Sequence, residues 1–167
     1  KKAGLVLLFK DIESAVERGC TGRIITSTYQ NFTDIESLKS FFSLMGQYSN
    51  FQCHLDYECF HDSSYATLGY HSKGYLFEFN DHQEVIVGPS LLKNIEWDVV
   101  VQDEAVYQQA MAEFEDKWNA THLLNSEILN LYANKLNFAI ERWDMDYDLS
   151  AAHIKPNFMQ RKALKEL

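Results

Sequence analysis

The sequence contains little proline, glycine or cysteine, with two, seven and three of these residues among 167. This scarcity excludes a collagen and leaves no low-complexity stretch. No apolar run approaches the roughly 20 residues that a membrane-spanning helix needs, so we expect no membrane partner. The apolar run Leu5–Phe9 is short and meets Lys10 and Asp11, so we do not interpret it as a secretory signal.

The three cysteines, Cys20, Cys53 and Cys59, are odd in number and form no C-x-x-C pair. Such a set is typical of reduced thiols in a cytoplasmic protein, which is the location that we expect. The cysteines and histidines between residues 53 and 71 fit no standard zinc spacing, and the adjacent Cys53 and His54 would point to opposite faces of a strand. We therefore predict neither a metal nor a cofactor.

Apolar residues make up 46% of the chain and aromatic residues 14%, so a sizeable core can be buried. The net charge is −9, and both the first 102 residues and the remainder carry an excess of acidic side chains. Neither part resembles a basic nucleic-acid-binding surface. A nucleic acid would have to meet a local positive pocket, or a positive surface on another domain or subunit.

Hydrophobic periodicity predicts alternating helices and strands over the first hundred residues. We expect a helix over 3–18 that stops at Gly19, and a second helix that begins at the capping box Thr33-x-x-Glu36 and ends at Gly46. The expected strands are 23–28, 51–57, a hairpin of 74–79 and 84–88 around an Asn80-Asp81 turn, and 95–101.

This order predicts an α/β fold in which helices flank a mixed β-sheet. From Asp103 onward the pattern is helical, with one apolar stripe of Val106, Ala110, Met111, Phe114 and Trp118, and another that runs from Ile128 through Leu131 to Trp143. We therefore divide the chain into a first domain over residues 1–102, a helical extension over 103–153 and a last segment over 154–167.

The most informative polar cluster is Tyr70-His71-Ser72-Lys73-Gly74. On a strand, His71 and Lys73 point to the same face, because successive side chains alternate. An ammonium can neutralise phosphate oxygens, while a neutral imidazole can attack phosphorus or donate a proton. The pattern H-x-K alone also occurs on ordinary exposed strands, so its interpretation depends on the residues that follow it.

The following residues resemble the phospholipase D superfamily, and more closely its nuclease domains at the front of bacterial helicase and restriction-type proteins. The resemblance covers roughly residues 3–102. Four segments carry it: Gly22-Arg23-Ile24-Ile25-Thr26-Ser27-Thr28-Tyr29, His71-Ser72-Lys73-Gly74-Tyr75-Leu76-Phe77, Ile86-Val87-Gly88-Pro89-Ser90 and Glu96-Trp97-Asp98-Val99.

The resemblance implies a metal-independent nuclease that forms a phosphohistidine intermediate, with His71, Lys73 and Glu96 as catalytic residues. Ser90 is a candidate phosphate contact, and Glu78 is either an orienting residue or an exposed hairpin residue. The family places two H-x-K motifs at one site, and this chain has one. The resemblance therefore implies a homodimer with a shared active site, acting on nucleic acid, with DNA favoured over RNA.

Several residues depart from the family pattern. Glu78 stands where Asp is usual, and Pro89 stands where Ser or Gly is common. The residues Leu91-Leu92-Lys93-Asn94 follow Ser90 directly, where relatives carry several more residues including an Asn. These departures leave open an alternative, namely an inactive phospholipase D-like module that binds nucleic acid or dimerises. A phospholipase is disfavoured, because the chain shows no basic interfacial helix.

The last segment shows a second resemblance. The residues from Ile154 to Leu164 include Gln160-Arg161-Lys162-Ala163-Leu164 and resemble the lead-in to superfamily 2 helicases. In those proteins a glutamine at this place reads adenine. This likeness implies that a helicase or ATPase region of the same longer chain follows, whereas an ordinary amphipathic terminal helix is the alternative.

Overall fold

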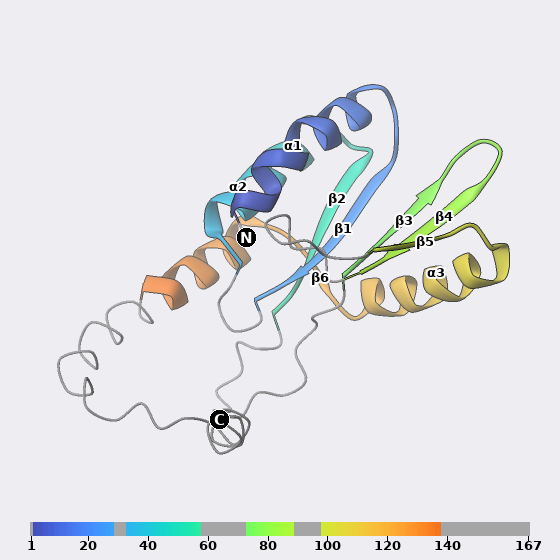
Figure 1. Ribbon diagram of the computed structural model, residues 1–167. Helices are drawn as coiled ribbons and strands as arrows, with labels where there is room; N and C mark the ends of the chain where they lie inside the picture. The colour runs from blue at the N-terminus through green and yellow to red at the C-terminus, as the bar shows by residue number, and fades with distance from the viewer. Residues whose placement is uncertain (1, 29–32, 58–72, 89–97, 138–167) are drawn as a thin grey trace, which may run out of the picture. The chain divides into compact units, whose positions relative to one another are not determined.

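The computed structural model describes residues 2–28, 33–57, 73–88 and 98–137 (Figure 1). These residues form a mixed α/β structure. Its elements are α1 (Lys2–Glu17), β1 (Gly22–Ser27), α2 (Ile35–Gln47), β2 (Phe51–Asp56), β3 (Gly74–Glu78), β4 (Gln83–Val87), β5 (Val99–Val101), α3 (Glu104–Asn119), β6 (His122–Leu123) and a helix over 126–137.

The strands form two sheets of three strands each, where the sequence predicts one mixed sheet. In the first sheet, β1 and β2 are parallel and pair from Gly22–Phe51 to Ser27–Asp56, while β6 pairs antiparallel to β2. The second sheet is an antiparallel meander of β3, β4 and β5. The two-residue strand β6 is too short to give a periodic signal, and the sequence does not predict it.

The core lies on one face of the first sheet. Alternate residues of β2, Phe51, Cys53 and Leu55, are buried, as the strand periodicity predicts. They meet an apolar layer from α1 and α2, in which the Phe41 ring lies 5.9 Å from the Phe51 ring. Figure 1 shows these two helices on one side of β1 and β2 and α3 on the other.

The helix α3 packs on the second sheet through its first half. Asp103 caps it by accepting a hydrogen bond from the Val106 backbone N–H at 2.9 Å. Tyr107 is buried, as is Val85 of β4, whereas Val106 is exposed. The predicted stripe therefore has the right period but is shifted at its start, because the aromatic neighbour of Val106 takes the inward position.

The helix ends test the capping predictions. Gly19 ends the first helix with a φ of 98°, a conformation that residues other than glycine rarely adopt. The second helix begins one residue later than expected. Asp34 accepts the capping hydrogen bond from the Ser37 N–H, and the Thr33 hydroxyl donates to the Ser27 carbonyl oxygen instead. The carboxylate of Asp34 replaces the predicted hydroxyl cap.

Contacts divide the chain into two compact units, residues 1–130 and 131–167. The first unit therefore includes α3, which the sequence assigns to a separate extension. Asn125 caps the helix over 126–137 by accepting from the Ile128 N–H, and Ile128 is buried while Leu131 is exposed. The predicted segment 154–167 lies outside the described residues.

Two described cysteines differ in their surroundings. Cys53 is fully buried, and burial raises the pKa of its thiol to about 12, whereas Cys20 is exposed. Because the thiolate is the reactive form, we expect Cys20 to react with a thiol reagent in the native protein and Cys53 to react only after unfolding. Thiol titration should show that Cys20→Ser removes a fast-reacting group and that Cys53→Ser does not; a fast-reacting Cys53 would contradict the buried position.

Candidate functional site

Three of the four segments that carry the resemblance are attached to the same end of the second sheet. In the antiparallel register, Gly74 pairs with Val87, and Val87 pairs with Val99. His71-Ser72-Lys73 immediately precedes Gly74, Gly88-Pro89-Ser90 immediately follows Val87, and Glu96-Trp97-Asp98 immediately precedes Val99. Lys73, Gly88 and Asp98, which are up to 25 positions apart in sequence, are thus attached to three consecutive strand ends, and neighbouring strands lie about 5 Å apart in a sheet.

Gly88 is required by the close approach of β4 and β5 at this end. A Cβ atom at position 88 would lie 1.7 Å from Asp98 Oδ1 and 2.9 Å from Asp98 Cα. A side chain here would therefore clash with the neighbouring backbone as well as with the carboxylate. The glycine of the Gly-Pro-Ser segment allows its chain to run directly against the segment that contains Asp98.

Among the site residues predicted from sequence, Lys73 and Glu78 lie in the described part of the chain. Lys73 is half-buried and directly precedes β3, at the end from which the three segments leave. His71, Ser90 and Glu96 lie outside the described residues, as do Tyr29, Tyr70 and Lys93.

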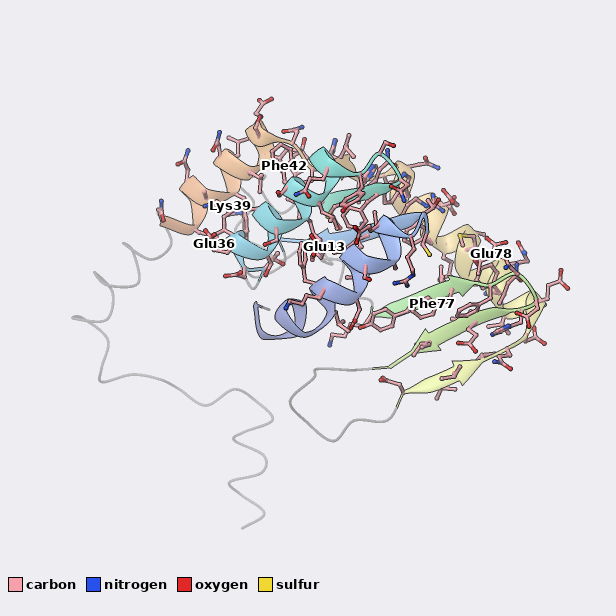
Figure 2. The ribbon with its side chains drawn as sticks, turned by 90° about the horizontal axis from the view of Figure 1, so that it is seen from above. Glu13, Glu36, Lys39, Phe42, Phe77 and Glu78 are labelled. Carbon is pink, nitrogen blue, oxygen red and sulfur yellow. The ribbon has the colours of Figure 1, made fainter. Side chains whose placement is uncertain are left out.

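Glu78 lies at the opposite end of β3, next to the hairpin turn and opposite Gln83 (Figure 2). It is five positions from Lys73 along extended chain, a distance of roughly 16 Å. Glu78 is exposed, and its charge contributes, after burial, to raising the pKa of Tyr107 on α3. Glu78 is thus an exposed residue beside the hairpin turn, and its role as an orienting residue stays a prediction.

A second polar cluster joins the first sheet to α3. The Arg23 guanidinium forms an ion pair with Glu115 Oε1 at 2.6 Å, and it lies 5.0 Å and 5.3 Å from the ring centroids of Phe114 and Trp118. The hydrogen bond from Arg23 lowers the pKa of Glu115. Arg23, which belongs to the first quoted segment, is therefore paired within the fold.

His54 belongs to the same cluster. Its ring stacks on Trp118 with centroids 3.6 Å apart, and its Nδ1 lies 3.2 Å from the Trp118 carbonyl oxygen. This distance fits Nδ1–H donation to the carbonyl. Burial lowers the pKa of His54, and the nearby charges of His122 and Arg23 lower it further. The ring is therefore held in its neutral form at neutral pH.

The third polar contact of α3 is a salt bridge at the carboxyl ends of the parallel strands. Lys117 Nζ lies 2.7 Å from Asp56 Oδ2, and the Asp56 side chain is 6% exposed. The buried Thr28 donates from its backbone N–H to the Asp56 carbonyl oxygen. Ligands of α/β sheets often bind at such strand ends. Here the charges neutralise each other, so the pair primarily connects α3 to the sheet.

Nothing in the sequence marks this cluster in advance. Asp56 and Lys117 are 61 residues apart. His54 is discussed above only among the residues that fit no standard zinc spacing. Among the described residues, no group of three or more His, Cys, Asp or Glu side chains is placed to hold a metal ion. In the same residues, no helix is both long and apolar enough to cross a membrane.

Loss of the Lys117 ammonium leaves a buried carboxylate without its ion-pair partner. We expect Lys117→Ala to lower the free energy of unfolding by about 2 kcal/mol. This loss is smaller than for a fully buried ion pair, because the Lys117 ammonium is partly exposed. The matched control is Lys39→Ala, since Lys39 forms an exposed ion pair with Glu36 at 2.8 Å (Figure 2). Loss of that pair should lower the free energy of unfolding by about 0.5 kcal/mol or less. Equal losses in urea unfolding would contradict a structural role for the Asp56–Lys117 pair.

The pH dependence of stability should depend on His54. Its folded-state pKa is below its ordinary value, so the unfolded chain binds the proton first as the pH falls. We expect stability to fall below about pH 6.5 and His54→Gln to remove part of that fall. His82 has the opposite shift, because Asp81 raises its pKa. In unfolding measurements from pH 7.5 to 5, His82→Gln should therefore make the loss of stability with falling pH steeper. A steeper loss in His54→Gln would contradict the lowered pKa of His54.

Comparisons with protein-family models, with curated proteins and with solved structures found no match to this chain. The likeness to phospholipase D-like nucleases therefore depends on the segments quoted above.

Proposed function

We propose that this chain is a metal-independent phosphodiesterase that cleaves nucleic acid through a phosphohistidine intermediate. The observation that carries the proposal is the strand register at one end of the second sheet. The register attaches the H-x-K, Gly-Pro-Ser and Glu-Trp-Asp segments to three neighbouring strand ends. Each segment directly adjoins its strand end, so a few residues of chain are enough to bring the three segments to one site. Lys73 lies at that end.

The proposed chemistry divides hydrolysis into two transfers. The neutral imidazole of His71 attacks phosphorus, a P–N bond forms, and the P–O bond to the leaving nucleotide breaks. The second His71 of the dimer, in its protonated form, gives a proton to the leaving oxygen. Water then attacks phosphorus, the second His71, now neutral, takes the proton from that water, and the P–N bond breaks to restore the free imidazole of the first His71. Lys73 neutralises the phosphate oxygens in both steps, and Glu96 holds the His71 tautomer.

The proposal requires two copies of the chain, because one chain carries a single H-x-K segment. A two-fold axis near the Lys73 end of the second sheet would bring two such segments to one phosphate. The resemblance in the last segment extends the proposal to a longer protein, in which a helicase or ATPase region follows this domain.

A second candidate function is a catalytically inactive module that binds nucleic acid or mediates dimerisation. Pro89 favours it, since proline has no backbone N–H to offer a phosphate oxygen and stands where the family carries Ser or Gly. The missing Asn after Ser90 favours it as well.

Cleavage of labelled DNA and RNA oligonucleotides in the presence of EDTA tests the proposal. We expect turnover that persists without metal, falls at least about 100-fold in His71→Ala, and falls further in Lys73→Ala than in Lys73→Arg. His122→Ala is the matched control, because His122 is an exposed histidine on β6 of the first sheet, outside the three segments. Cleavage that needs a divalent metal, or that survives in His71→Ala, would overturn the proposal.

A further inference from the structure

A row of aromatic side chains covers one face of the second sheet. Tyr75 and Phe77 alternate along β3, and Phe79 continues the row beyond the strand, where its N–H donates to the His82 carbonyl oxygen across the turn. Neighbouring ring centroids are 6.4 Å apart for Tyr75–Phe77 and 6.1 Å apart for Phe77–Phe79. The His82 ring stacks on Phe79 at 4.5 Å. We call Tyr75, Phe77 and Phe79 the aromatic row.

The core does not account for the aromatic row. The alternate face of the sheet carries Val85, which is buried, and packs against α3. The three aromatic side chains remain 41–47% exposed on the other face, which also carries the exposed Val100 of β5. An antiparallel sheet with one face in the core normally presents polar side chains on the other. An exposed apolar patch of this kind marks a binding surface.

The geometry of the rings favours flat ligands. The planes of Tyr75 and Phe77 are parallel within 4°, and the plane of Phe79 is inclined by 31° to that of Phe77. The spacing of Tyr75 and Phe77 is set by the two-residue repeat of the strand. Every nucleobase has a flat π face, and proteins that bind single-stranded nucleic acid stack successive bases on exposed aromatic residues. A duplex hides those faces in its own stack.

Charged groups lie at both ends of the row. Asp81 is paired with His82 at 2.7 Å, and Glu84 accepts a hydrogen bond from Gln102 and lies 3.3 Å from His82 Nε2. His82 neutralises these carboxylates when it is protonated, and the Asp81 hydrogen bond raises its pKa. Lys73 supplies a positive charge at the other end of the row, where the three motif segments leave the sheet.

We propose that the aromatic row is a stacking platform for about three consecutive bases of a single-stranded nucleic acid and leads its backbone toward Lys73. The assignment of Lys73 to the reacting end depends on the proposed function, whereas the stacking itself does not. The described part of the sheet provides few cations. Binding should therefore depend weakly on salt, with roughly one counterion released per chain.

Fluorescence anisotropy of labelled 12-nucleotide single strands and matched duplexes, with the full chain in the His71→Ala background, tests this proposal. We expect single strands to bind more tightly than duplexes. Tyr75→Leu and Phe77→Leu should each weaken single-strand binding roughly fivefold to a hundredfold, the loss of one stacked base. Phe42→Leu is the matched control, because Phe42 is an exposed aromatic residue on α2, and its substitution should leave binding unchanged (Figure 2).

Thermal unfolding and sedimentation of each variant separate the outcomes. Weakened binding with an unchanged melting temperature supports the platform. Equal affinities in all variants, tighter binding of the duplex or no binding of single strands would each overturn it. If the leucine variants instead lose a dimer while their affinity is unchanged, the face contacts a second copy and the proposal is wrong. Cleavage that persists without the platform would leave the proposed function intact, and binding without cleavage would leave the platform intact.

Discussion

The arrangement of the first unit depends on one helix that contacts both sheets. The two sheets have separate hydrogen-bonded ladders, and α3 packs its first half on the second sheet through Tyr107. Its second half contacts the first sheet through the stacked Trp118 and the Lys117–Asp56 pair. The apolar contact and the ion pair act together, because the buried Asp56 carboxylate would be costly without its ammonium partner.

The elements that could be predicted are those with clear turn residues or a clear hydrophobic periodicity. The hairpin with its Asn80-Asp81 turn, the first helix with its stop at Gly19, and the strand β2 all follow from turn residues and periodicity. The helix cap at Asp34 was missed because Thr33 and Asp34 are both good caps, and tertiary contacts decide between them. The short strand β6 forms only because β2 offers it an edge, which no local pattern reveals.

The candidate site shows the same division. Spacing and resemblance singled out Lys73 and Gly88, and the antiparallel register places both at the same end of the second sheet. The cluster around Arg23, His54 and Asp56 could not be predicted, because each member meets a partner on α3 more than 60 residues away. The aromatic row was visible only as alternating rings, and their exposure became clear once α3 was placed on the other face.

The pairing of Arg23 with Glu115 has a consequence for the kinetics of association. A guanidinium already neutralised within the fold adds little to the long-range attraction for a polyanion, and the chain as a whole carries a net charge of −9. A nucleic acid that approaches this chain in isolation therefore meets net repulsion. Added salt screens that repulsion, so the encounter rate would rise with ionic strength, the reverse of the behaviour of basic nucleic-acid-binding proteins.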